Sequence, residues 1–508
     1  MARSRANKSG ATAVEVGNYD DIADRCPDHP MGDPHRTAFR PLHNGSIRVE
    51  GRPERLTAHA GVLLLRELDE RLGATSALES ALDDLRTPTR VEHPLGLLLR
   101  TAIYGMAIDS AHAAAAADLA DDAVFRIATS DRRGLSMLEE DAATPSQSTL
   151  SRLGSLLSTD GNLSVLRGAL FDWAVRSVRA TGPERLDEVT LDIDSYPIRV
   201  HGHQAGSAYN GHYRSRCYHP LGVMLGETGH WLDLRLRPGN EHTADGAEEL
   251  IAPLIDRARA ELSDAVRVRG DAGFISPEFL DLLDGKQVPY ALRIPKNSEL
   301  EKHEEIHARR PPGRPPAYLR TWCHDIEYRA LRWPEARRVV LVVEEVPGDL
   351  FLKTYFIVTS FTEDELCARD VLDFYRARGT MEGHIGEMKS VLAGRLSSTN
   401  RRKRRYARRE IKKHVKPVDP ERVNAAVLCV QALGYNLLNT FRSLAGTSAF
   451  IDEPAELHLR RARALLVVPG RIVRSAGRAT LVIRDVALAA WQSVVERLRQ
   501  LRPPCAVA

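Results

Sequence analysis

The stretch from Glu188 to Val200 constrains the fold more than any other part of this sequence. In EVTLDIDSYPIRV, apolar residues alternate with Thr190, Asp192 and Asp194, and this two-residue period predicts a strand with one apolar and one polar face. Strand patterns also occur in HPLGVMLGE, HWLDLRLRP, AVRVRGD and VPYALRI. A helical segment, TADGAEELIAPLIDRARAEL, lies before AVRVRGD, and a second, SPEFLDLLDG, lies between AVRVRGD and VPYALRI. We therefore expect a mixed α/β sheet covered by helices, in the order β-β-β-α-β-α-β.

Helical patterns lie on both sides of this region. Residues 57–182 include AGVLLLRELDERLG and PLGLLLRTAIYGMAIDSAHAAAAADLA, whose apolar residues recur at helical spacing. TPSQSTLSRLGSLL, with Pro145 and hydroxyl caps, is typical either of a helix-turn-helix or of a plain helical core. After the sheet, Asp419-Pro420 predicts a helix start, RALLVVPGRIVRSAGRATLVIRD predicts a hairpin, and a final helix contains Trp491.

Residues 296–360 interrupt the sheet pattern. They contain the loop RRPPGRPP and then RRVVLVVEEV and LFLKTYFIVTS, which flank Pro347-Gly348-Asp349. Two apolar runs around such a turn predict a hairpin. We expect a β-rich insertion here, followed by one long helix over about residues 363–390.

The charge of the chain is concentrated in one segment. The net charge is +3, yet residues 401–416 hold ten Lys or Arg and one acid, Glu410, so this segment carries +9 and the rest of the chain −6. Such a block is typical of a protein that contacts nucleic acid or another polyanion. A solvated helix face is the alternative, but it would need compensating acids every three or four residues.

Composition excludes several classes of protein. The chain is 43% hydrophobic and 27% charged, which excludes global disorder, and no run approaches the ~18 apolar residues of a membrane span. No apolar stretch follows the first basic residues, so we expect no signal peptide. Six cysteines without a Cys-x-x-Cys pair fit a reducing cytosol.

Carboxylates are the candidate chemical groups. Magnesium takes hard oxygen ligands, and two-metal phosphoryl transfer needs acids that converge from different elements. Asp192 and Asp194 share one face of the first strand, and Asp271 ends the strand AVRVRGD. On a continuous helix at about 100° per residue, Glu382 lies beside an apolar stripe, whereas Glu387 lies on the far side and is expected to face solvent. The arc around Glu382 also holds Tyr375, Arg378 and Lys389, and the stripe holds Phe374, Met381, Ile385 and Met388.

The segment YRARGTMEGHIGEMK matches Tyr-x2-Arg-x3-Glu-x6-Lys. This resembles the signature of bacterial insertion-sequence transposases, whose catalytic domain is RNase H-like and carries an Asp-Asp-Glu triad. Several other segments are similar to one subgroup of that superfamily, over roughly residues 57–485: LDIDSYPIRVHGHQAGSAYNGHYRSRCYHPL, RPGNEHTADGA, RGDAGF, YALRIPKN, ALGYNLLN and SQSTLSRL.

The resemblance implies a DNA transposase that cleaves phosphodiesters at element ends and transfers the strand to target DNA. Its catalytic, metal-binding acids would be Asp194, Asp271 and Glu382, with Asp192 as the alternative to Asp194, and the cofactor would be two Mg²⁺ or Mn²⁺ ions. The partners implied are element-end and target duplexes, with a homodimer assembled on DNA and a cytoplasmic, nucleoid-associated location. A non-catalytic DNA-binding protein and a nuclease without strand transfer are the alternatives.

The expected DNA contacts come from three sources. Tyr375, Arg378 and Lys389 match the DNA-contacting positions of the signature. Trp322 and Trp333 either stack on a flipped base, as in some relatives, or pack in the insertion. The remaining contacts are in the basic segment: Arg401, Arg402, Lys403, Arg404, Arg405, Arg408, Arg409, Lys412 and Lys413.

These patterns divide the chain into seven expected parts. They are a flexible tail (1–45), a helical DNA-binding or dimerisation domain (46–183), the first part of an RNase H-like core (184–295), a β-rich insertion (296–360), the core helix with Glu382 (361–400), the basic segment (401–417) and a mainly helical C-terminal region (418–508).

Overall fold

The computed structural model describes 38–39, 43, 49–50, 55–109, 116–132, 134, 136–138, 144–314, 316–392, 396–399, 419–446, 458–475 and 477–502. It divides into two units, residues 1–55 and 56–508. In the first unit, β1 (Ala38–Phe39) pairs antiparallel with β2 (Val49–Glu50), and the boundary falls in β3 (Arg55–Thr57). The basic segment 401–417 and most of the expected tail lie outside the described residues.

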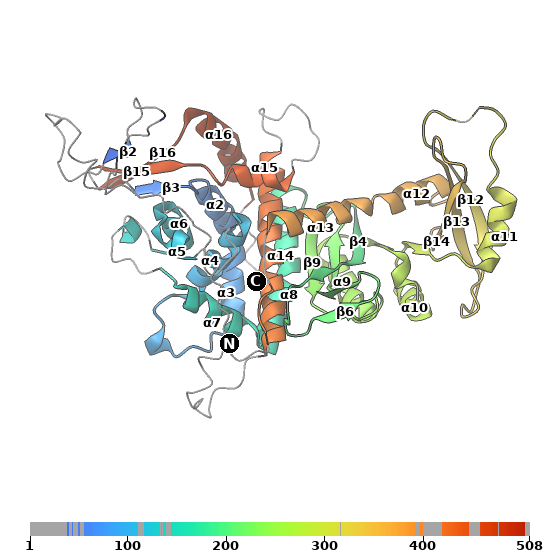
Figure 1. Ribbon diagram of the computed structural model, residues 1–508, viewed down its shortest axis with the longest axis horizontal. Helices are drawn as coiled ribbons and strands as arrows, with labels where there is room; N and C mark the ends of the chain where they lie inside the picture. The colour runs from blue at the N-terminus through green and yellow to red at the C-terminus, as the bar shows by residue number, and fades with distance from the viewer. Residues whose placement is uncertain are drawn as a thin grey trace, which may run out of the picture. The chain divides into compact units, whose positions relative to one another are not determined.

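The second unit is built around an eight-stranded mixed sheet (Figure 1). Its spatial order is β12-β13-β14-β11-β10-β4-β8-β9. The strands are β4 (Glu188–Ser195), β8 (Leu221–Leu225), β9 (His230–Arg235), β10 (Ala265–Gly270), β11 (Tyr290–Ile294), β12 (Arg320–Tyr328), β13 (Arg337–Glu345) and β14 (Lys353–Thr359).

The part of the sheet from β9 to β11 has the RNase H-like arrangement expected from the sequence. Strands β4, β8 and β9 form an antiparallel meander, and β10 and β11 then add in parallel to β4. The two crossovers carry α9 (Ala247–Glu261) and α10 (Pro277–Gly285), as the alternating pattern predicted. Helix α9 begins after Gly246, whose φ of 74° suits glycine.

The strands of residues 296–360 extend this sheet, which corrects the expectation that they interrupt it. The predicted hairpin of β13 and β14 is present, and β14 pairs antiparallel with β11, so the hairpin continues the core sheet at its edge. A short helix, α11 (Ser298–His307), leads from β11 to β12. A separate three-stranded sheet, which the sequence patterns missed, contains β5 (Ile198–Arg199), β6 (Ala208–Asn210) and β7 (Ser215–Tyr218).

The two faces of the sheet bury different side chains. Odd positions of β4 pack with α9 and α10 in one apolar cluster. The opposite face packs against α12 (Ala368–Arg376), through Val371, Leu372 and Tyr375. A second helix, α13 (Gly379–Val391), follows after Ala377 and Arg378. The single long helix expected over about residues 363–390 is therefore two helices.

Helices from both ends of the chain form a second core. The first group is α2 (Val62–Leu72), α3 (Ala74–Ala81), η1 (Pro88–Arg90), α4 (Leu95–Ala107), α5 (Ala116–Asp121), α6 (Ala123–Thr129), η3 (Ser136–Leu138), α7 (Gln147–Leu157) and α8 (Asp160–Thr181). The second is α14 (Pro420–Ala445), α15 (Leu459–Ala464), the predicted hairpin of β15 (Gly470–Ser475) and β16 (Arg478–Val482), and α16 (Asp485–Gln500).

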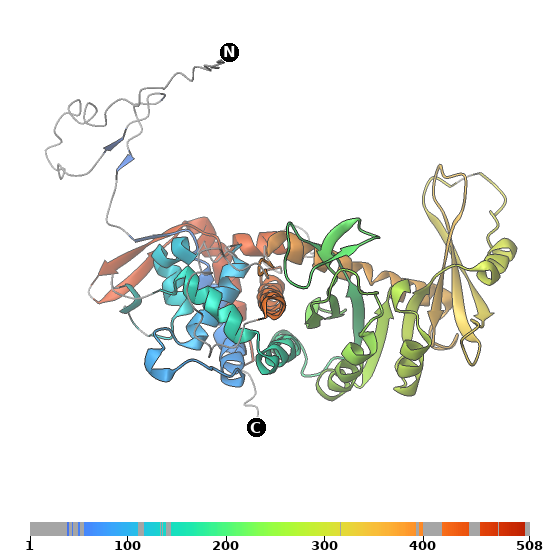
Figure 2. The same cartoon turned by 60° about the horizontal axis from the view of Figure 1, so that its bottom comes forward.

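Helix α14 joins this second core to the sheet. It lies between the helical region and the sheet (Figure 2) and contacts α4, α8 and edge strand β9. Its start is the one predicted, because the Asp419 side chain accepts a hydrogen bond from the Glu421 backbone and Pro420 occupies the first turn. The same core buries the predicted stripe of Met381, Ile385 and Met388, which fixes α13 beside the sheet.

The segment TPSQSTLSRLGSLL forms α7 with Ser146 as its cap. Helix α7 ends at Leu157, and α8 begins at Asp160. Helix α7 packs on α8 and α14 and so belongs to the helical core. None of the helices that the structure describes has the length and apolar character needed to cross a membrane.

Candidate active site

Two aspartates on the polar face of β4 have different environments. Asp192 is 1% exposed, and its two oxygens accept hydrogen bonds of 2.6 and 2.8 Å from Nε and Nη2 of Arg269. Arg269 lies opposite it on β10 and also donates to the Phe374 carbonyl at the end of α12. Asp192 therefore forms a buried structural ion pair, and its oxygens are already used.

The two oxygens of Asp194 have different partners. Its Oδ1 accepts a hydrogen bond from the Ser195 backbone at 2.8 Å, and its Oδ2 lies 3.1 Å from Nη1 of Arg378. Burial, with added repulsion from Asp271 and Glu382, raises the pKa of Asp194 to about 6 against the attraction of Arg378. Of the two aspartates, Asp194 is therefore the one whose carboxylate faces the other candidate acids.

Asp271 follows the last residue of β10, and β10 runs parallel to β4 with Gly270 beside Ile193. The chain then turns into η4 (Ala272–Phe274). A cavity of about 330 Å³ opens beside Asp271 at the ends of β10 and β11. Its other lining residues are Ala272, Arg293, Ile294, Pro295, Lys296, Thr354 and Tyr355.

Arg378 lies at the junction of α12 and α13 and contacts two of the candidate acids. Its Nη1 contacts Asp194 as described, and its Nη2 donates to Oε1 of Glu382 at 2.9 Å. The Arg378 side chain is 12% exposed and that of Glu382 is 62% exposed. Burial opposes the charged form of Arg378, but Asp194, Tyr375, Asp271 and Glu382 together raise its pKa.

The three acids come from the end of β4, the end of β10 and the first turn of α13, and all of them influence Arg378. Three carboxylates are the hard oxygen donors that Mg²⁺ and Mn²⁺ take, so the donor set fits these ions. Within the described ranges, however, no group of three His, Cys, Asp or Glu is arranged to hold a metal ion. The guanidinium of Arg378 contacts two of the three acids instead.

The other residues of the signature lie close by. Tyr375 is 8% exposed and packs under the sheet, and Cζ of Arg378 lies 6.0 Å from the centre of its ring. Nζ of Lys389 lies 4.6 Å from the ring centre of Tyr196, two residues beyond Asp194. Tyr375 thus supports Arg378 from the protein interior, and Lys389 lies on the same side of α13 as the acids.

The two tryptophans of residues 296–360 are placed differently. Trp333 is 4% exposed, packs edge-on to Tyr328 and has Arg337 over its ring. Trp322 is partly buried in β12 and packs against the core cluster of the sheet. In this structure Trp333 therefore packs within the protein, which was the alternative to stacking on a base. The part of the expected contact surface in residues 401–417 is outside the described ranges.

Two residues near Asp194, His219 and Tyr213, were not among the site residues expected from the sequence. Nε2 of His219 lies 3.1 Å from Oγ of Ser195, and the ring of Tyr213 packs on His219 with centroids 5.9 Å apart. Burial first, and then the charges of Asp194 and other groups including Asp271, raise the pKa of Tyr213. Only the fold, which pairs β8 with β4 and β7 with β5, brings these groups to the acids.

The expectation that Glu387 faces solvent is wrong. Its side chain is 11% exposed, pairs with Arg442 of α14 at 2.8 Å, and accepts a hydrogen bond from the Leu459 backbone at 2.9 Å. His384 lies 3.7 Å from the same carboxylate. A helical wheel treats α13 alone, whereas α14 and α15 cover the side that carries Glu387.

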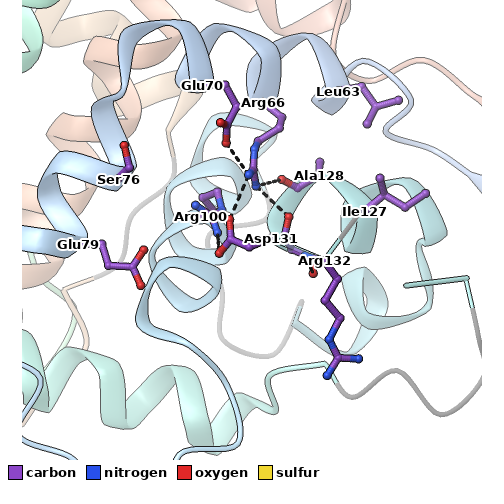
Figure 3. A pocket seen from close by; sticks show the side chains of 11 residues that line it. Leu63, Arg66, Glu70, Ser76, Glu79, Arg100, Ile127, Ala128, Asp131 and Arg132 are labelled. Atoms are coloured by element: carbon purple, nitrogen blue, oxygen red, sulfur yellow. Dashed lines mark hydrogen bonds and ion pairs between the residues drawn. The ribbon is translucent and has the colours of Figure 1, made fainter. Parts of the chain in front are cut away.

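A second cavity, of about 520 Å³, lies in the helical region among α2, α3, α4 and α6 (Figure 3). Its charged groups largely neutralise each other, because Arg66 pairs with Glu70 and Asp131, and Arg100 also pairs with Asp131. Glu79 accepts a hydrogen bond from the Gly96 backbone. This mixed charge contrasts with the acids gathered around Arg378.

A family model described as "Transposase DDE domain group 1" matches residues 39–503. The chain belongs to this family. The match covers the helical region, the sheet and the C-terminal elements, and proteins of this family generally use divalent metal ions. It agrees with the transposase resemblance found in the sequence. A search of curated proteins finds no match.

Among solved structures, the chain is similar to a piggyBac transposase in a synaptic complex with hairpin DNA. The sequence identity is 10% and the TM-score is 0.37, and the alignment covers 88% of this chain and 83% of the other.

Proposed function

We propose that this DDE-family transposase is encoded by a bacterial insertion sequence, cleaves phosphodiesters at the element ends and joins the freed 3′ end to target DNA. The observation that carries the proposal is the gathering of Asp194, Asp271 and Glu382 around Arg378 in a chain of this family. Asp194 and Glu382 both contact the Arg378 guanidinium, and Asp271 and Glu382 oppose the charged form of Asp194. A perturbed carboxyl group with charged neighbours of this kind is typical of a functional site.

Asp194, Asp271 and Glu382 would hold Mg²⁺ or Mn²⁺, with two ions expected. When bound, the ions supply Lewis acidity and lower the pKa of a water molecule so that it can attack a phosphodiester. Asp192 is a poor alternative ligand, because a movement of Asp192 toward a metal ion would leave the buried charge of Arg269 without a partner. Ser195 and His219 hold the end of β4 through their 3.1 Å contact and the Ser195 backbone hydrogen bond to Asp194.

The cavity beside Asp271 supports double-stranded DNA as the partner. It contributes two cations, Arg293 and Lys296, immediately next to a candidate metal ligand. Lys389 adds a third cation on α13. Cations placed around a metal site suit the phosphates of a DNA strand. A homodimer on DNA remains part of this proposal.

The decisive experiment combines element-end DNA, a target plasmid and Mg²⁺. Asp271→Asn and Glu382→Gln should each abolish cleavage and retain DNA binding, because each removes a metal-ligating charge with little change in volume. Asp264→Asn is the matched control, since this aspartate precedes the same strand at its other end and is 98% exposed. Mn²⁺ should replace Mg²⁺, and Ca²⁺ should permit binding without turnover.

The products separate the alternatives. Joined element–target DNA supports the transposase, cleavage without joining indicates a nuclease, and binding without cleavage indicates a DNA-binding protein that has lost catalysis. Full activity in the Asp271 and Glu382 variants, or in the presence of a chelator, would rule out the proposed metal site.

A further inference from the structure

We propose that Arg378 closes the metal site in the DNA-free protein, and that a DNA phosphate opens it by drawing Arg378 away. The inference rests on the proposed function and adds regulation to the same site. We call Arg378 with its contacts to Asp194 and Glu382 the Arg378 bridge. Divalent ions and the guanidinium would then compete for the same two carboxylates.

The geometry of the bridge is that of a cation held between two ligands. One terminal nitrogen contacts Asp194 at 3.1 Å and the other contacts Glu382 at 2.9 Å. A guanidinium has a rigid, planar fork of donors, so using both ends fixes its position between the two acids. Because its side chain is only 12% exposed, the guanidinium occupies space between the strand and the helix that ions would need.

Charge gives the bridge its effect on metal binding. Asp194, Asp271 and Glu382 repel one another. In the absence of DNA and metal, the positive charge of Arg378 offsets part of this repulsion. A divalent ion placed on Asp194 and Glu382 would stand next to this guanidinium, and like charges at such short distance oppose each other strongly. Metal binding therefore requires Arg378 to leave both carboxylates.

The surroundings of Arg378 allow it to leave toward DNA. Glu382 is 62% exposed, so one end of the bridge is open to solvent. Gly379, Gly383 and Gly386 follow at spacings that share one face of α13, and a Cβ at each would meet nothing within 4 Å. A DNA backbone can approach this bare face closely, and its phosphates would offer Arg378 a bidentate partner.

Mn²⁺ binding measured by calorimetry in the absence of DNA tests the competition. Arg378→Gln should bind Mn²⁺ about tenfold more tightly than the native protein, because the competing charge is gone. Arg378→Lys should fall between them, since a lysine keeps the charge but cannot bridge two carboxylates. Arg369→Gln on α12 is the matched control, because Arg369 is exposed and pairs only with Asp373 among the described residues; its Mn²⁺ affinity should stay native.

The same titration with a duplex oligonucleotide tests the opening by DNA. DNA should increase the Mn²⁺ affinity of the native protein by a larger factor than that of Arg378→Gln, because only the native protein has a bridge to release. Linkage then requires Mn²⁺ to tighten DNA binding by the same larger factor in the native protein. Equal factors in the two proteins, or Mn²⁺ binding in Arg378→Gln that is no tighter than native, would overturn the inference.

A further variant separates this outcome from failure of the proposed function. If Asp271→Asn binds Mn²⁺ as the native protein does, the three acids are not the metal site and both proposals fail. If Asp271→Asn loses Mn²⁺ while Arg378→Gln binds it with native affinity, only the Arg378 bridge is refuted. Thermal melting of each variant confirms that the fold is intact, and Arg378→Lys provides the test if Arg378→Gln does not fold.

Discussion

At the scale of single residues, Asp192 and Asp194 on β4 are expected to have different roles, the first in stability and the second in metal binding. Asp192→Asn should lower the free energy of unfolding by about 3 kcal/mol, because it leaves Arg269 as a buried charge without its carboxylate partner. Asp194→Asn should cost little stability, because burial and the neighbouring acids already disfavour its charge. The loss in this second variant should be in Mn²⁺ binding and DNA cleavage.

Denaturant unfolding without metal, alongside Mn²⁺ titration, measures both effects. A stable Asp192→Asn protein that has lost Mn²⁺ binding, together with a native-like Asp194→Asn protein, would reverse the assignment. Asp187→Asn is a useful control, because this aspartate lies just before β4 and outside its paired residues.

The sequence could place both aspartates on one face of a strand, but it could not distinguish them. The two-residue period makes positions 192 and 194 equivalent. What separates them is Arg269, which β10 brings opposite Asp192 from 77 positions further along the chain. Arg378 likewise reaches Asp194 from a distant helix junction. Partners of this kind depend on strand order and helix packing, which local periodicity does not encode.

At the scale of elements, α13 depends on a carboxylate that sequence reasoning placed in solvent. Glu387 joins α13 to Arg442 of α14 and to the first residue of α15. Glu387→Gln should therefore destabilise the protein by about 2–4 kcal/mol at neutral pH, because Arg442 loses a largely buried partner. The cleavage rate should fall as well if α13 then holds Glu382 less firmly.

The pH dependence checks the cause. Burial opposes the charge of Glu387, but His384, the Leu459 backbone and Arg442 outweigh it and lower the pKa below its usual 4.5. A carboxyl group whose pKa is lower in the folded than in the unfolded protein stabilises the fold above about pH 4.5. This stabilisation is lost as the pH falls through the pKa of the folded state. The stability difference between native and Glu387→Gln proteins should accordingly shrink below about pH 4. A difference independent of pH would point to packing.

The elements themselves were more predictable than their connections. The order of β4, β8, β9, α9, β10, α10 and β11, the hairpins and the start of α14 follow from period, turn residues and caps that lie within each segment, whereas β5, β6 and β7 were missed. The attachment of β14 to β11 was missed, because edge pairing joins segments that the intervening α11 and β12 separate. The break between α12 and α13 was also missed, because the apolar spacing was read as one continuous helix.

At the scale of the whole second unit, α14 links the helical region to the sheet through polar contacts as well as apolar ones. The Asn436 side chain is 1% exposed, accepts from the Trp231 backbone N–H and donates to its carbonyl, each at 2.8 Å. Strand β9 is the last strand of the sheet, so these two bonds satisfy part of an edge that would otherwise be open. The helical core that packs against α13 is thereby tied to the sheet that carries Asp194.

The residues on both sides of the basic segment are held by hydrogen bonds within the second unit. Before it, the Ser398 backbone is held by Ala205 and by the Asn424 side chain; after it, Asp419 caps α14. The charge of +9 in residues 401–416 follows, in the sequence, Ser398 and Thr399, which pair with Ala205 and Gln204. We expect this charge to bind DNA phosphates without reading sequence.

A pair of matched variants tests this expectation. Six arginines of the segment are replaced by Gln in one protein and by Lys in the other: Arg401, Arg402, Arg404, Arg405, Arg408 and Arg409. If all six contact phosphates, the Gln protein should reduce the slope of log affinity against log salt by about 5, since each contact contributes roughly 0.9. The Lys protein should keep the native slope, and both should retain the preference for element ends over random duplex. An unchanged slope in a folded Gln protein would assign the segment to solvent or to a protein partner, because a charge that grips phosphate must release counterions when it binds.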